Sequence, residues 1–177
     1  MHLCQLTISS HHFLVGLLFV APAKKWKWST DKGAFIIKWL LKKSILLRFY
    51  LKNISMGSTV NFVEFKQCPI PTTSYAELSK DMDLINLKKL WIRYGFSEAY
   101  EIMAGQFNGL GPGLQQLKII NSQGVQSFNS LAFKGLADLE SLELINNPRL
   151  QSFSEGIFLP LSNLVSLEIR QSAIKGQ

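Results

Sequence analysis

The second half of the chain carries four copies of one spacing of apolar residues. Each copy places Leu or Ile at its first, fourth and sixth positions and other residues between them. The copies start at Leu87, Leu114, Leu139 and Leu164, so successive starts lie 27, 25 and 25 residues apart. Alternation over the last positions predicts a short strand with one buried face. A fixed period in this range indicates a solenoid, in which each repeat buries its apolar face against its neighbours.

Further apolar positions recur at fixed distances after the starts at Leu114 and Leu139, and the copy from Leu87 carries the same Phe-x-Gly-Leu element, Phe107 to Leu110, one residue late. Aliphatic residues follow the starts by eleven and twenty-two positions, and phenylalanines follow by fourteen and nineteen. A helical protein with coincidental leucine spacing would not repeat at all four distances. We therefore expect the phenylalanines to fill the outer side of the stack. The positions are Val125, Leu150, Ile174, Phe128, Phe153, Phe133, Phe158, Leu136 and Leu161.

A fainter copy lies upstream, with apolar residues at Val60, Val63 and Phe65. Eight residues after its start stands Cys68, and the copy from Leu139 has Asn147 at this place. A small polar side chain here can turn inward and hydrogen-bond the backbone as the chain leaves the strand. The same position holds Gly95, Ser122 and Ser172 in the other copies.

Together these residues resemble the leucine-rich repeat L-x-x-L-x-L-x-x-N/C-x-L, and the resemblance covers residues 60–177 in about five copies. The segment Ala132–Leu136 is similar to extracellular repeats, including those of invertebrate secreted proteins such as non-catalytic luciferase subunits. The resemblance implies an α/β repeat fold. In this leucine-rich-repeat solenoid, short parallel strands form the concave face, and loops or short helices form the convex face. It also implies a protein-binding function.

Strand residues that point away from the stack are expected to line the concave face. One column is Glu64, Trp91, Lys118, Glu143 and Glu168, and the next is Lys66, Arg93, Ile120, Ile145 and Arg170. Trp and Arg are enriched at the centres of protein interfaces. For residues other than Trp91, solvated strand positions without a partner stay an open alternative. The residues predicted to contact a protein ligand are Trp91, Arg93, Lys118, Ile120, Glu143 and Ile145.

The N-terminus has the pattern of a secretory signal peptide. Phe13–Val20 is apolar apart from Gly16 and ends in Ala21-Pro22-Ala23, a small-x-small cleavage pattern. Residues 1–23 are therefore predicted to be a signal peptide, and the protein to be extracellular. Because no Lys or Arg precedes the run, an unprocessed N-terminus or a wrongly assigned start stays open. In a secreted chain, Asn53 would be a glycosylation site, since Asn53-Ile54-Ser55 is a sequon.

Residues 24–59 form a basic segment of different composition. Residues 24–52 hold nine Lys or Arg and one acid, a net charge of +8, whereas residues 53–177 have a net charge of −1. The overall charge of +7 thus lies outside the repeats, and no nucleic-acid partner is expected. Residues 34–52 are predicted to be a helix with a broad apolar face and a cationic stripe, which suits a membrane surface. The alternatives to a membrane-surface helix are a helix that caps the solenoid and translated non-coding sequence.

The chain lacks the motifs of catalysis. It has no phosphate-binding loop, no dinucleotide fingerprint and no zinc spacing, and residues 60–177 contain no histidine, the commonest general base. We therefore expect a monomeric, non-catalytic protein without catalytic residues, cofactor or metal. The last repeat is only begun at Gln177, so we also expect a fragment. The alternatives are part of a receptor or adhesion ectodomain, a membrane-surface protein acting through residues 34–52, and a non-functional truncated product.

Overall fold

The structure is a computed structural model. It describes the backbone of residues 3–10, 30–31 and 34–40. It also describes residues 60–66, 84–96, 99–110 and 113–174 with their side chains, apart from that of residue 85.

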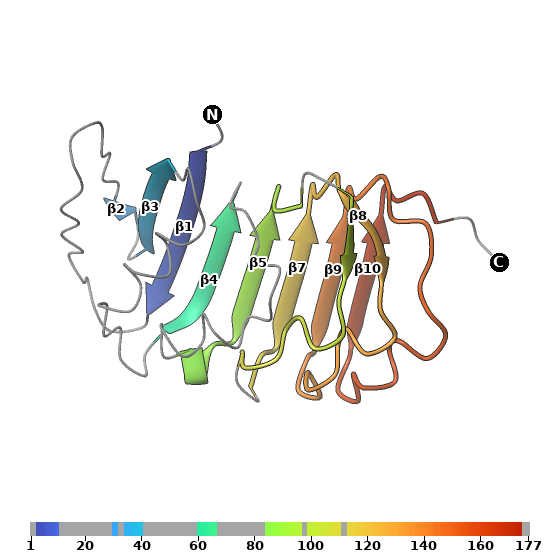
Figure 1. The fold of residues 1–177 in the computed structure, drawn as a ribbon. Helices are drawn as coiled ribbons and strands as arrows, with labels where there is room; N and C mark the ends of the chain where they lie inside the picture. Colours follow the sequence, from blue (N-terminus) through green and yellow to red (C-terminus); the bar gives the residue numbers. More distant parts are fainter. Residues whose placement is uncertain are drawn as a thin grey trace.

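One sheet runs through the molecule, with the strand order β10-β9-β7-β5-β4-β1-β3-β2 (Figure 1). Its parallel part contains one strand from each predicted repeat, in unbroken sequence order. Each repeat therefore stacks directly on the previous one, and the predicted solenoid of short parallel strands is confirmed. The strands are β4 (Val60–Lys66), β5 (Lys89–Arg93), β7 (Gln116–Ile120), β9 (Ser141–Ile145) and β10 (Ser166–Arg170).

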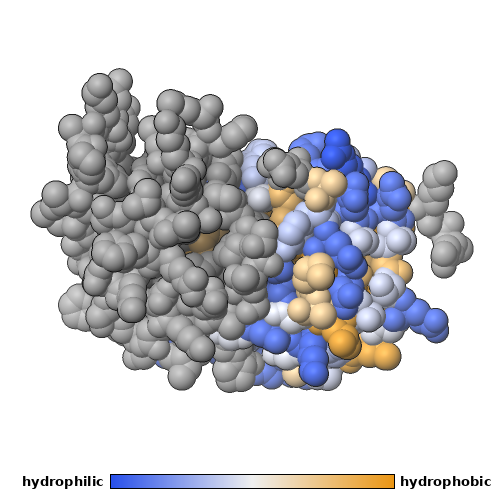
Figure 2. Space-filling view, viewed as in Figure 1, coloured by the Kyte–Doolittle hydropathy of each residue, from blue (hydrophilic) through white to orange (hydrophobic). Residues whose placement is uncertain are grey.

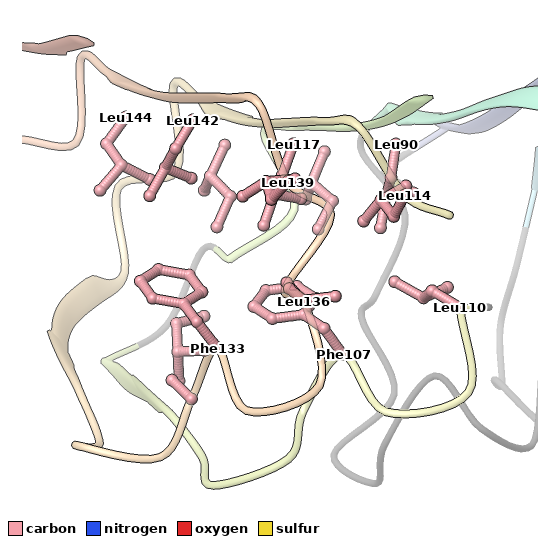
Figure 3. Close-up of a cluster of buried hydrophobic side chains, with 14 of the residues drawn as sticks. Leu90, Phe107, Leu110, Leu114, Leu117, Phe133, Leu136, Leu139, Leu142 and Leu144 are labelled. Carbon is pink, nitrogen blue, oxygen red and sulfur yellow. The ribbon is translucent and has the colours of Figure 1, made fainter. Parts of the chain in front are cut away.

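The core forms because every strand turns the same residues inward. In β7 and β9 the second and fourth residues are buried and the others are partly exposed. The register pairs equivalent residues, so that Leu90, Leu117 and Leu142 lie side by side in one row. Figure 3 shows the leucines of successive repeats facing Phe107 and Phe133 across the interior. A single repeat could not bury this face, and the stack buries it without any slip in register.

Phenylalanines fill the far side of the core, as the spacing predicts. Phe107, Phe133 and Phe158 stack in a column with ring centroids 6.1 and 6.2 Å apart. Phe128 lies beside this column, 5.3 Å from Phe133. The chain returns over these rings mostly in turns and loops. The sequence did not predict the short parallel sheet of β6 (Tyr100–Ile102) and β8 (Val125–Phe128) on this side.

Helix is scarce in the described part of the chain. The only helical element there is the 3-10 turn η2 (Leu84–Asn86) before β5. No helix within the described ranges has the length and apolar character that crossing a membrane requires.

Asn147 bridges two repeats from inside the core. Its Nδ2 donates a hydrogen bond to the Ile119 carbonyl at 2.9 Å, and its Oδ1 accepts one from the Ser122 backbone N–H at 3.0 Å. This confirms the predicted inward turn of a polar side chain at this position. Ser122, the equivalent residue one repeat earlier, is also buried, but its Oγ has no hydrogen-bond partner. For Ser122 the expected side-chain bond to the backbone is therefore wrong.

The predicted helix over residues 34–52 is wrong in its first part. Ala34–Leu40 forms strand β3, which pairs antiparallel with β1 (Leu3–Ser10) and with β2 (Thr30–Asp31). Phe, Ile and Trp dominate Ala34–Leu40 and favour strands, and a short helix without packing is marginal in water. Pairing with β1 provides hydrogen-bond partners for the backbone N–H and C=O groups of β3. Residues 41–52 lie outside the described residues.

Strand β1 also pairs antiparallel with β4, so it joins the N-terminal strands to the repeat sheet. Its residues belong to the segment predicted to be a signal peptide. The apolar run Phe13–Val20, the sequon at Asn53 and the predicted ladder residue Cys68 lie outside the described residues.

Burial decreases toward the last strand of the sheet. Leu142 in β9 is buried, whereas its neighbour Leu167 in β10 is 44% exposed. Phe158 is only partly buried, in contrast to the buried Phe133 one repeat earlier. Elsewhere, seen from the side shown in Figure 2, the described surface is largely hydrophilic with separate hydrophobic patches. Leu164 and Ile169, in the same repeat as Leu167, are also partly exposed.

Candidate protein-binding face

The sheet turns one face away from the core, and we call this the open face. It consists of the outward residues of β4, β5, β7, β9 and β10. The register aligns them in rows that cross the strands. All six predicted binding residues lie in two adjacent rows on β5, β7 and β9, as Trp91-Lys118-Glu143 and Arg93-Ile120-Ile145.

Trp91 is held in a fixed orientation on this face. Its ring meets Phe62 edge-on, with centroids 4.9 Å apart and an interplanar angle of 79°. Its Nε1 donates a hydrogen bond to Gln116 Oε1 at 3.2 Å. Lys118 Nζ lies 4.8 Å from the centroid of its ring, and Arg93 Cζ lies 5.7 Å from it. Each cation–π contact at a partly exposed site contributes about 0.5–1 kcal/mol.

Two ion pairs flank Trp91. Lys118 Nζ lies 2.7 Å from Glu143 Oε1, its neighbour in the predicted column, and the two side chains are only 18% and 16% exposed. On the other side, Arg93 Nη1 lies 3.3 Å from Glu64 Oε1. This second contact is an ion pair by distance alone, because Glu64 Oε1 and Arg93 Nε make no hydrogen bond. Of the two cations beside Trp91, Arg93 therefore has the weaker contact with its carboxylate partner.

The Lys118–Glu143 pair should show measurable coupling in a double-mutant cycle. For Lys118→Met and Glu143→Gln we expect a coupling free energy of about 0.5–1 kcal/mol, at the upper end for cross-strand pairs because both side chains are shielded from water. The cycle is measured by urea unfolding of the four proteins, and it separates the pair from the contact of Lys118 with Trp91. Arg170 and Glu168 are the control, since Arg170 is largely exposed and their coupling should be near zero. Strict additivity at Lys118 and Glu143 would contradict the expectation.

Tyr94 belongs to this region although the sequence analysis did not select it. It directly follows β5, is 46% exposed and has a positive φ of 55°. The equivalent residues Asn121, Asn146 and Gln171 also have positive φ, between 51° and 56°. Asn146 Nδ2 donates to Asn121 Oδ1 at 2.6 Å, which links two of these turns. The two asparagines one period apart, a residue type that tolerates this conformation, were the available signal.

The open face combines several kinds of side chain. It presents an aromatic ring, cations, carboxylates and aliphatic side chains. Among the residues that the structure describes, no group of three or more His, Cys, Asp or Glu could hold a metal. Burial raises the pKa of the Tyr100 phenol, which lies in β6 away from this face and donates a hydrogen bond to Gln106 Oε1 at 3.0 Å.

The fold and this face define a solenoid of stacked strand-and-loop repeats. Residues 112–174, which include β7, β9 and β10, match the family described as leucine rich repeat. These residues are leucine-rich repeats. No curated protein matches its sequence. The similarity to non-catalytic luciferase subunits therefore stays a prediction.

Proposed function

We propose that the protein is a non-catalytic interaction module that binds a protein ligand on the open face, as the concave face of the solenoid. The observation that carries this proposal is Trp91, which is fixed between two cations in the middle of a rigid sheet. The proposal includes secretion of the protein to the extracellular space, which rests on the sequence pattern of residues 1–23.

Preorganisation supports Trp91 as the centre of the interface. An interface loses about 0.5–1.5 kcal/mol for each rotamer-rich side chain that binding immobilises. Phe62 and Gln116 already hold the indole, so Trp91 loses little freedom on binding. Trp, Tyr and Arg are the residue types most often found as hot spots. Trp91, Arg93 and Tyr94 bring all three together at the end of one strand.

The neighbouring row supplies apolar contact area. Ile120 and Ile145 are paired in register on β7 and β9, and both are partly exposed. Isoleucines on the solvent side of a sheet leave apolar surface that a partner can cover. The ion pair of Lys118 with Glu143 lies directly beside them and would form part of the polar rim.

The double substitution of Trp91→Ala and Ile120→Glu should weaken binding of a genuine ligand at least 30-fold, the equivalent of about 2 kcal/mol. The control is Met103→Ala with Lys134→Glu, because both residues are exposed and lie outside the open face. Proteins retained by the immobilised full chain and by both variants are compared by quantitative mass spectrometry, and the dissociation constant of each candidate is then measured. The Trp91→Ala, Ile120→Glu variant should lose about 1–2 kcal/mol of stability with the two cation–π contacts, so circular dichroism must show that both variants are folded before binding is compared.

A ligand that is retained by the wild type and the control but lost by the Trp91→Ala, Ile120→Glu variant supports the proposal. If every retained protein binds both variants equally, the open face is not the binding site.

A further inference from the structure

We propose that the ligand presents an acidic amphipathic helix, which lies across the strands with a carboxylate at Arg93 and apolar side chains over Ile120 and Ile145. This inference rests on the proposed function and names the chemistry of the partner.

The open face is electrically divided. Its outward residues on β4, β5 and β7 include four cations and one carboxylate, a net charge of +3. On β9 and β10 they include two carboxylates and one cation, a net charge of −1. Residues 53–177 as a whole have a net charge of −1, so the cations are concentrated locally and do not reflect composition. The cations are Lys66, Lys89, Arg93 and Lys118.

The outer strands of the two halves act separately on a ligand, although Lys118 and Glu143 pair where the halves meet. Neighbouring strands lie about 4.8 Å apart, so the distance from β5 to β10 is about 14 Å. This exceeds the screening length of about 8 Å in physiological salt. A group bound near Trp91 therefore interacts mainly with the cationic half, and carboxylates are favoured there.

Arg93 is the cation best placed to receive a carboxylate. Its side chain remains 39% exposed, and its contact with Glu64 lacks hydrogen-bond geometry. Lys118, in contrast, is largely shielded in its pair with Glu143. A carboxylate from a ligand can supply the hydrogen bonds that Glu64 does not, because guanidinium and carboxylate pair through two parallel bonds.

The row that begins at Arg93 matches the repeat of a helix better than that of a strand. Arg93, Ile120 and Ile145 occupy neighbouring strands, so the row spans two strand spacings, or about 9.6 Å. Residues i and i+7 of an α-helix lie about 10.5 Å apart along its axis. In an extended peptide, residues on one face are two or four positions apart, at about 6.6 or 13 Å, because successive side chains point to opposite faces. An acid at i with apolar residues near i+3 and i+7 therefore fits the row.

The test uses three synthetic helix-forming peptides of equal length. The first has Glu at i and Leu at i+3 and i+7, the second has Lys in place of Glu, and the third contains the residues of the first in scrambled order. The readout is the fluorine resonance of Trp91 in the full chain labelled with 5-fluorotryptophan, assigned through Trp91→Phe. A signal local to Trp91 is needed because residues 24–52, with a net charge of +8, attract any acidic peptide. The tryptophans at 26, 28 and 39 report such binding separately.

The ordered acidic peptide should shift the Trp91 resonance saturably and bind at least tenfold more tightly than the other two. Arg93→Glu should weaken its binding at least tenfold, and Arg93→Gln, which does not place a carboxylate beside Glu64, should weaken it severalfold. Lys134→Glu, the matched control outside the face, should leave binding within twofold. Raising the salt concentration should weaken binding by the ordered peptide.

Equal or tighter binding of the Lys peptide or the scrambled peptide at Trp91 would overturn the proposal, as would tighter binding of a twelve-nucleotide oligothymidylate. Failure of the acidic peptide to shift Trp91 would also overturn it. If a captured protein still depends on Trp91 and Ile120, only the chemistry of the partner is wrong. If no captured protein depends on them, the proposed function fails as well.

Discussion

Replacement of Phe133 with alanine should lower the free energy of unfolding by about 3–5 kcal/mol, the usual cost of removing a buried aromatic ring and leaving a cavity. Phe133 is fully buried, and its ring lies between Phe107 and Phe158 in the column and next to Phe128. The turns around it are fixed by backbone hydrogen bonds, so the cavity can collapse only partly. Urea unfolding followed by circular dichroism measures the change.

Phe158→Ala is the matched comparison for Phe133→Ala. It removes the same ring from the same column one repeat later, where the side chain is only partly buried. Its expected cost is smaller, about 1–3 kcal/mol, because less apolar surface is withdrawn from water. Equal losses for the two variants would show that the column does not have the burial gradient described above.

Replacement of Asn147 with alanine should lower the free energy of unfolding by about 2–4 kcal/mol. The change leaves the Ile119 carbonyl and the Ser122 backbone N–H buried without this partner, and each unsatisfied group costs about 1–3 kcal/mol. The side chain also joins consecutive repeats, so its loss should reduce the cooperativity of unfolding. Calorimetry and urea unfolding together measure both effects.

Asn163→Ala is the control for Asn147→Ala. Asn163 also bonds a residue 25 positions away, through a contact of 3.4 Å with Asp138, but this contact is exposed. Its replacement should change stability by no more than about 0.5 kcal/mol. A similar loss for both asparagines would mean that burial is not the reason Asn147 matters.

The repeated part of the fold could be predicted because every repeat buries the same positions against its neighbours. Leu90, Leu117 and Leu142 occupy equivalent places, so one spacing specifies strand, face and register at once. For the same reason the neighbours of Trp91 across the sheet could be predicted, including the pairing of Lys118 with Glu143. Periodicity carries this information only where the sequence repeats.

Features that depend on a single residue or a non-local partner could not be predicted in this way. Tyr94 occupies the exposed turn after β5. The equivalent position holds asparagine in the next two repeats, so the repeat pattern did not point to a tyrosine there. The strand at Ala34–Leu40 depends on pairing with β1, and nothing in its own apolar pattern distinguishes it from a helix. Ser122 matches the expected residue type, yet only its backbone N–H bonds to Asn147.

The position of β1 has a consequence for maturation of the chain. Because β1 lies between β4 and β3, it is the only described strand through which Ala34–Leu40 pairs with the repeat sheet. Cleavage after Ala23, as a signal peptide requires, would remove β1 and leave β4 with a row of unpaired N–H and C=O groups. Such an edge is a template for the addition of another strand. Cleavage would then determine whether the free edge of β4 pairs with β1 or is available to a strand of another molecule.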